Sequence, residues 1–148
     1  MQQTIIRHML EVKGYDVWCI RPGASVFDAL CILSDKDIGA LLVMEGDEMV
    51  GIMSERDYAR KVILLGKTSR DTRVDEIMSK TVFTIHPDQT IEEAMELMNI
   101  KHIRHLPVLE NDKVIGIISI GDLVKAIIFK QLEAIKSLEN MLVLQWQH

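Results

Sequence analysis

Two short stretches decide the fold: GIMSERD at residues 51–57 and GIISIGD at residues 116–122. Both carry the pattern Gly-x-x-Ser-x-x-Asp, and the second lies 65 positions after the first. Outward from these motifs, residues 17–63 align with residues 82–128 without a gap. Two copies are too few for a solenoid, which needs three or more repeats. We therefore predict two similar halves related by a pseudo-twofold axis.

Each copy has the predicted order β-α-β-β-α. It begins with a short apolar segment (VWCI or VFTI) that runs into a proline, which ends regular strand pairing. A capping-box pattern then predicts the start of a helix, at Ser25-x-x-Asp28 and at Thr90-x-x-Glu93. Apolar residues at i, i+3, i+4 and i+7 follow, which indicates one buried helix face. These residues are Val26, Ala29, Leu30 and Leu33 in the first copy and Ile91, Ala94, Met95 and Met98 in the second.

A hairpin and a second helix complete each copy. Apolar runs flank the polar turns EGDE and ENDK, where Gly46 or Asn111 can adopt a positive φ. A helix is expected to start at each motif serine, and the first of these helices is expected to end at Gly66. The predicted fold class is therefore α/β (α+β), with a leading helix and a long C-terminal helix added to the repeats.

The chain divides into three parts on this pattern. Residues 1–66 hold the first repeat with its leading helix, residues 67–81 form a polar linker with a short helical turn at VDEIM, and residues 82–148 hold the second repeat. Residues 123–146 stay apolar at helical spacing. This C-terminal helix either packs back on its own domain or forms a subunit interface, and the sequence leaves both alternatives open.

The composition is that of a soluble globular protein, with 48% hydrophobic and 26% charged residues among 148. A net charge of -5 without a basic tail argues against general binding to nucleic acid or to an anionic membrane. No segment has the apolar length of a signal peptide or a membrane span, so we expect a cytoplasmic protein. Cys19 and Cys31 lack a metal-binding spacing and have apolar neighbours, so we expect buried free thiols.

No catalytic or metal-binding motif is found in the sequence. GKTS at residues 66–69 resembles the end of a P-loop, but the position five residues before Gly66 is Lys61 instead of glycine. His102 and His105 have no neighbouring cysteines or carboxylates to complete a metal site. We therefore predict a protein that is not an enzyme and holds no metal.

The repeated serine and aspartate have two interpretations. A serine followed three positions later by an acid caps a helix by bonding to its free N–H groups. Alternatively, the serine and those N–H groups bind a phosphate, while the aspartate accepts hydrogen bonds from a ribose. Three features favour the ligand-binding interpretation. The acid is aspartate in place of the longer Glu or Gln, a glycine lies within each predicted strand, and the positive end of each helix suits a phosphate. The pattern alone leaves both interpretations open.

Two β-α-β-β-α copies, each closing with Gly-h-x-Ser-x-x-Asp (h, apolar), resemble a tandem of CBS domains, or Bateman module, of the small stand-alone bacterial type. The resemblance covers about residues 8 to 130. It implies an adenosine-containing ligand, such as AMP, ADP, ATP, NAD or S-adenosylmethionine, in clefts shared by the two repeats. It also implies a homodimer and, in some members, signalling of ligand occupancy to a partner protein, whose identity the sequence does not give.

The resemblance also implies which residues form the two clefts. In the first, the base lies among Ile20, Arg21, Val26, Ile38 and Gly39, the ribose meets Asp122, and the phosphate meets Ser119 and His105. In the second, the base lies among Ile85, His86, Ile91, Ile103 and Arg104, with Asp57 at the ribose and Ser54 and Arg56 at the phosphate. Gly121 stands where the first motif has Arg56, so the two phosphate sites are expected to differ.

The sequence thus predicts a non-enzymatic sensor of adenosine nucleotides that acts through a partner. One alternative is a structural dimerisation module whose motifs are only helix caps. A second alternative is an enzyme that processes nucleotides.

Overall fold

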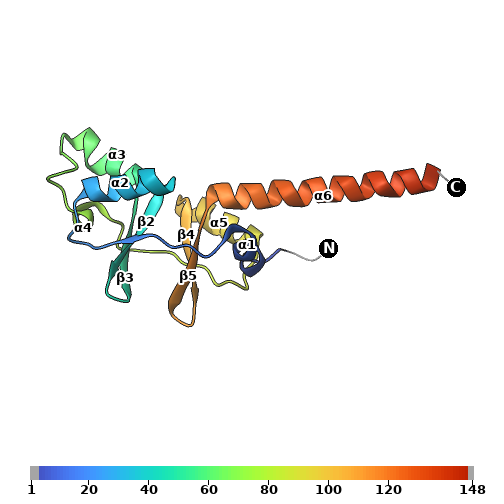
Figure 1. Cartoon of the computed structure of the whole chain (residues 1–148), viewed down its shortest axis with the longest axis horizontal. Helices are drawn as coiled ribbons and strands as arrows, with labels where there is room; N and C mark the ends of the chain where they lie inside the picture. The colour runs from blue at the N-terminus through green and yellow to red at the C-terminus, as the bar shows by residue number, and fades with distance from the viewer. Residues whose placement is uncertain (1–3, 147–148) are drawn as a thin grey trace. The chain divides into compact units, whose positions relative to one another are not determined.

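The structure, a computed structural model, describes residues 4–146, which fall into two units. The first-repeat unit is Asp16–Phe83. The second-repeat unit combines the residues up to Tyr15 with those from Thr84 onward. Each unit is built on an antiparallel strand pair with helices against it, so the predicted α/β (α+β) fold class is confirmed (Figure 1).

A three-stranded sheet in the order β1-β2-β3 organises the first-repeat unit. Its elements are β1 (Cys19–Ile20), α2 (Val26–Lys36), β2 (Ala40–Glu45), β3 (Glu48–Ser54), α3 (Glu55–Lys61), the 3-10 helix η1 (Ile63–Leu65) and α4 (Val74–Ile77). Strand β1 pairs parallel with β2, and β2 pairs antiparallel with β3. The helix predicted to reach Gly66 is divided, because α3 ends at Lys61 and the 3-10 turn leads to Gly66 at φ 72°.

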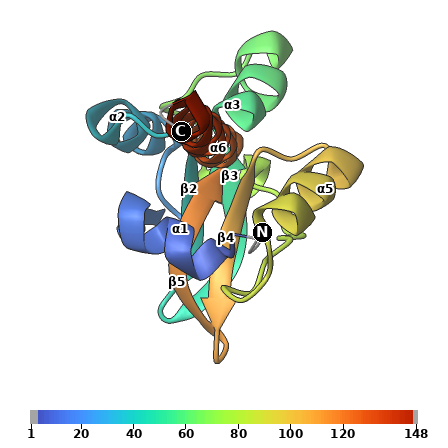
Figure 2. The same ribbon diagram turned by 90° about the vertical axis from the view of Figure 1, so that its right-hand side faces the viewer.

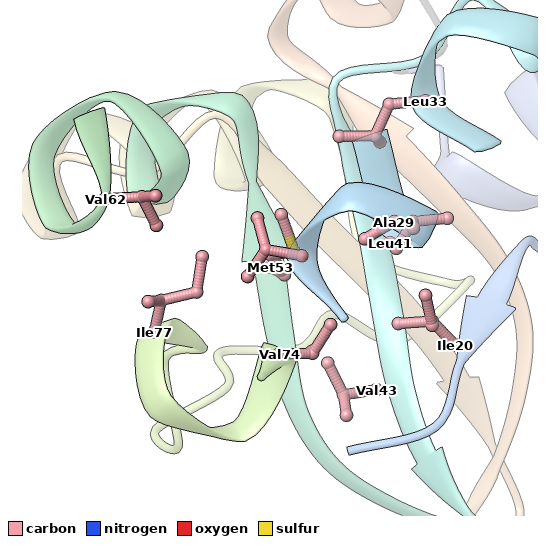
Figure 3. Close-up of a cluster of buried hydrophobic side chains, with 10 residues drawn as sticks. Ile20, Ala29, Leu33, Leu41, Val43, Met53, Val62, Val74 and Ile77 are labelled. Carbon is pink, nitrogen blue, oxygen red and sulfur yellow. The ribbon is translucent and has the colours of Figure 1, made fainter. Parts of the chain in front are cut away.

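Aliphatic side chains from every layer of this unit meet in one core. Residues on the two long strands, on the inner face of α2 and on α4 point toward one another (Figure 3). The buried members are Ile20, Val26, Ala29, Leu33, Leu41, Val43, Met53, Val62, Val74 and Ile77. The helical spacing of Val26, Ala29, Leu30 and Leu33 predicted this face. Three of the four are buried, and Leu30 is partly buried against the same core.

The second-repeat unit repeats this plan with fewer strands. Its elements are α1 (Ile6–Lys13), α5 (Ile91–Lys101), β4 (His105–Glu110), β5 (Lys113–Ser119) and α6 (Ile120–Trp146). The strand predicted at residues 82–85 is reduced to a single parallel bridge between Ile85 and Val108. The hairpin turn has positive φ at Asn111 and Asp112, which suits the twist of the paired strands.

The leading helix α1 packs on the second repeat, although it precedes the first repeat in the chain. Ile6 N–H donates to the Gln89 carbonyl at 2.9 Å, and Arg7 N–H donates to the Pro87 carbonyl at 2.7 Å. The linker helix α4 makes the corresponding bonds in the first-repeat unit, with Ala24 and Pro22 as acceptors. Chain order alone predicts that α1 belongs to the first repeat, whereas these hydrogen bonds attach it to the second.

One further expectation from the sequence is corrected by the structure, and the two alternatives left open for the C-terminal helix can be compared with it. Cys19 and Cys31 are exposed free thiols, because Cys19 alternates with buried Ile20 on β1 and Cys31 lies off the buried face of α2. The C-terminal helix does not pack back on its own unit along its length. Within the described part of α6, Leu123 near its start is the buried residue.

The motif glycines, Gly51 and Gly116, lie on the hairpins at points where another segment of the same unit packs closely against the strand. A Cβ on Gly51 would come 2.6 Å from the Met78 Sδ and 2.9 Å from the Ser79 carbonyl oxygen. A Cβ on Gly116 would come 2.9 Å from Cδ2 of Leu10. In the structure, these glycines therefore make room for protein atoms, and their presence no longer argues for a ligand.

We expect Gly51→Ala to destabilise the protein by about 1–3 kcal/mol, because the new methyl group meets a backbone oxygen. Gly116→Ala should cost less, since it meets only the end of a flexible leucine side chain. Urea unfolding measures both. The control is Gly23→Ala, whose Cβ would lie 3.7 Å from the nearest atom. Equal costs at Gly51 and Gly116 would contradict this account.

Candidate functional site

The first motif forms a reciprocal capping box where β3 passes into α3. The Ser54 Oγ accepts a hydrogen bond from the Asp57 N–H at 3.3 Å, and the Asp57 Oδ2 accepts one from the Ser54 N–H at 2.9 Å. The Ser54 hydroxyl also donates to Asp57 Oδ2 at 3.1 Å. Lys61, one helical turn later, lies 3.1 Å from the other carboxylate oxygen of Asp57. The Asp57 side chain is only 14% exposed.

The second motif forms the same reciprocal pair where β5 passes into α6. The Ser119 N–H donates to Asp122 Oδ2 at 2.8 Å, and the Asp122 N–H donates to the Ser119 Oγ at 3.1 Å. The cation beside this aspartate comes from a different element. Lys13, the last residue of α1, places its Nζ 2.6 Å from Asp122 Oδ2 and also donates to the Ile117 carbonyl. The Asp122 side chain is 20% exposed.

The capping interpretation of both motifs is therefore confirmed. Each aspartate is turned back toward the start of its own helix, and each already has a lysine partner. Capping and ligand binding are not exclusive, because a carboxylate offers about four acceptor positions. A ribose would have to share the carboxylate with the capped backbone and compete with the lysine.

The second motif lies in a mixed electrostatic environment. His105 is directly opposite Ser119 in the strand register. Burial, Lys13 and Arg104 lower the pKa of His105 to about 4, although the Asp122 carboxylate opposes this shift. Burial raises the pKa of Asp122, but the hydrogen bonds from Lys13 and Ser119 outweigh burial, so its pKa is lowered. At neutral pH this region therefore holds an ionised aspartate beside a neutral imidazole.

In each unit, one of the residues predicted to surround the base is hydrogen-bonded through its backbone carbonyl to the helix that follows the motif serine. The Glu55 N–H donates to the Gly39 carbonyl at 3.1 Å, and the Ile120 N–H donates to the Arg104 carbonyl at 2.9 Å. Gly39 and Arg104 are thus held at the first residue of α3 and of α6, respectively. The predicted phosphate residue Arg56 lies in the first turn of α3 and is half-buried.

Most apolar residues predicted to contact the base instead belong to the cores. Ile20 is 8% exposed, Val26 is fully buried, and Ile85 and Ile91 are each 2% exposed. Burial explains why these positions are apolar without reference to a ligand. Among the other predicted base residues, Ile38 and Ile103 are half-buried, whereas Arg21, His86 and Arg104 are exposed and accessible.

Two lysines that contact the motif aspartates, Lys13 and Lys61, are not among the site residues predicted from the sequence. Lys61 had a signal, because it stands at i+4 from Asp57 on the same helix. Lys13 had none, since its contact with Asp122 depends on α1 packing against the second repeat. Among residues 4–146 no group of three or more His, Cys, Asp or Glu side chains is placed to hold a metal ion. No helix in that range is long and apolar enough to span a membrane.

Comparison with known proteins identifies the family. Residues 11–63 and 74–129 each match the profile of the CBS domain. The chain therefore belongs to the CBS-domain family and carries a tandem pair of these domains. Proteins of this family are generally regulatory and not catalytic.

Similar proteins include small stand-alone CBS proteins. The chain is 34% identical over 147 residues to the mitochondrial CBS domain-containing protein CBSX3 of Arabidopsis thaliana, covering 93% of this chain and 71% of that protein. It is 45% identical to a solved protein with CBS domains from Burkholderia ambifaria MC40-6, covering 86% of this chain and 96% of that one, with a TM-score of 0.84.

A second solved structure shares the fold at lower identity. It is the CBS domain pair of protein MJ0100 in complex with 5′-methylthioadenosine and S-adenosyl-L-methionine. That structure is 24% identical to this chain, with a TM-score of 0.78 over 87% of this chain and 99% of that one.

The lowered pKa of His105 predicts a dependence of stability on pH. Between about 6.5 and about 4, the unfolded chain binds a proton at this histidine that the folded chain does not bind. Stability should therefore fall as the pH drops through this window, by up to about 1.4 kcal/mol per pH unit. Urea unfolding of His105→Gln should show a shallower pH dependence than the wild type. His8→Gln controls for the loss of an exposed histidine, and equal slopes for all three proteins would refute the prediction.

Proposed function

We propose that the protein is a non-enzymatic regulatory module that binds an adenosine nucleotide (AMP, ADP, ATP or NAD) through its two Ser-x-x-Asp motifs. The observation that carries this proposal is the duplicated strand-to-helix junction, at which a serine, an aspartate and the positive end of a helix occur together in both units. Membership of the CBS family supports the ligand class. The adenosine compounds bound by protein MJ0100 agree with it, although that likeness concerns the fold.

The capping box orients the carboxylate that would hold the ribose. Hydrogen bonds from the Ser54 N–H and hydroxyl fix one oxygen of Asp57, while the other oxygen contacts Lys61, whose Nζ also donates to the Ile77 carbonyl at 2.8 Å. Two ribose hydroxyls can donate to that second oxygen when the lysine moves aside. The lysine ammonium, released from the carboxylate, then becomes a partner for a phosphate.

The phosphate would lie at the start of α3 or α6. Both helices begin directly after a motif serine, so the positive end of each helix dipole lies at the junction, although the first N–H group of each helix already donates to the Gly39 or Arg104 carbonyl. Arg56 in the first motif, and His105 with Arg104 near the second, would add donors. The two motifs are therefore proposed to differ in their preference for phosphate.

The ligand would act by changing the population of two arrangements of the chain. It can shift that equilibrium only by its difference in affinity for the two arrangements. We propose that an unidentified partner protein recognises the change, that the chain acts as a homodimer, and that it acts in the cytoplasm. Exposed free cysteines suit a reducing compartment.

Two other functions make different predictions. A structural dimerisation module would use the motifs only as helix caps, and the observed capping boxes favour it as the second candidate. Such a module would give no calorimetric heat with any of the four nucleotides. An enzyme would convert ATP or NAD on prolonged incubation, which chromatography of the nucleotide detects.

Calorimetry and thermal unfolding with AMP, ADP, ATP and NAD test the sensor. At a ligand concentration a hundredfold above Kd, binding should stabilise the wild type by about 2.7 kcal/mol. Asp57→Ala and Asp122→Ala should each lose about 1 kcal/mol of stability without ligand, because each removes a cap. Each should also abolish binding at one of the two sites and leave the other intact.

The matched control is Glu76→Ala. Glu76 accepts a hydrogen bond from the Arg73 N–H at 2.6 Å and so caps α4 in the first-repeat unit, but it is not among the proposed ligand residues. This variant should lose similar stability and keep both sites. Equal loss of binding in Glu76→Ala and Asp57→Ala would show that capping alone explains the aspartate.

A further inference from the structure

Helix α6 exposes apolar side chains along nearly its whole length. It has 27 residues, which corresponds to about 40 Å. Figure 1 shows it extending well past the β4–β5 hairpin of its own unit, and Figure 2 shows it nearly along its axis. The match to the CBS domain ends at residue 129, so more than half of α6 is an addition to the family fold.

Five of the exposed apolar residues of α6 lie on one seam. Seven positions spaced alternately by four and three residues lie on one helix face, which is the spacing of a coiled coil. They are Val124, Ile128, Gln131, Ile135, Leu138, Leu142 and Gln145. The five aliphatic members are between 41% and 60% exposed. A stripe of this size on a soluble protein marks an interaction surface.

We propose that the seam packs against the same seam of a second copy of this chain, with the two helices antiparallel. In the register centred near residue 133, Ile128 lies opposite Leu138 of the second copy, and Leu142 lies opposite Val124. The surface is then self-complementary, as a twofold interface requires. Gln131 lies close to the twofold axis, opposite Ile135 of the second copy.

Charges beside the seam select the antiparallel direction. Lys125 and Glu139 occupy the same flank, 14 residues apart. In the proposed register, Lys125 of each copy lies next to Glu139 of the other, so two ion pairs form. A parallel pair would place Glu139 next to Ala134 and Lys125 next to Ile120, with no opposite charge at either position.

Charge reversal in the full-length chain tests the pairing, with sedimentation equilibrium as the measurement. Lys125→Glu should weaken dimerisation about tenfold, because it replaces two attractions with two repulsions. Adding Glu139→Lys should restore the wild-type Kd. The control Lys136→Glu makes the same charge change away from the seam and should leave the Kd unchanged. A wild-type monomer at micromolar concentration, or no rescue in the double variant, would overturn the proposal.

Cross-linking tests the direction independently. In a Cys19→Ser, Cys31→Ser background, Ile128→Cys and Leu138→Cys chains should form a disulfide when mixed and little when each is alone. Strong cross-linking of Ile128→Cys with itself would show a parallel pair and overturn the proposed register. Binding of a monomeric chain to phosphatidylcholine–phosphatidylserine vesicles would show that the seam serves a lipid surface instead. Ligand addition is not required, so these outcomes are separate from those of the nucleotide experiment.

Discussion

The hydrogen bonds between each motif serine and its aspartate set the point at which a strand becomes a helix. They satisfy N–H groups that the start of a helix would otherwise leave unpaired. They also determine where the carboxylates point and which lysines can reach them. Any ligand that uses these aspartates must therefore work with groups that already stabilise the fold. Under the proposed function, binding and stability would be coupled at the same four side chains, Ser54, Asp57, Ser119 and Asp122.

The two units share this junction but differ in the source of the cation beside it. Lys61 belongs to the helix that Asp57 caps, so the first pair is local. Lys13 comes from a helix more than 100 positions away in the chain, so the second ion pair forms only when α1 is packed on the second-repeat unit. A ligand that displaced Lys13 would also weaken the attachment of α1, and displacement of Lys61 would break its hydrogen bond to the Ile77 carbonyl at the end of α4. In each unit the lysine beside the aspartate thus also connects the motif to a second helix.

The sequence predicted what depends on local pattern and on repetition. The helix caps at Ser25 and Thr90, the buried stripes of α2 and α5, and the hairpin turns at Gly46 and Asn111 all follow from short-range spacing. Packing between distant segments had no such signal, which is why the position of α1 and the contact of Lys13 were missed. The prediction that both thiols are buried was wrong, because apolar neighbours in the sequence do not imply apolar surroundings in the folded chain. The site assignments came from the family resemblance, and burial alone explains several of their apolar members.

The position of α1 has a consequence for biosynthesis. Every segment of the first-repeat unit lies between Asp16 and Phe83, so this unit can close as soon as that stretch leaves the ribosome. The second-repeat unit needs the earliest residues of the chain as well as the late ones. During translation α1 must wait, with Ile6, Met9 and Leu10 uncovered, until the β4–β5 hairpin exists. A bulky N-terminal fusion would consequently disturb the half of the protein that is made last.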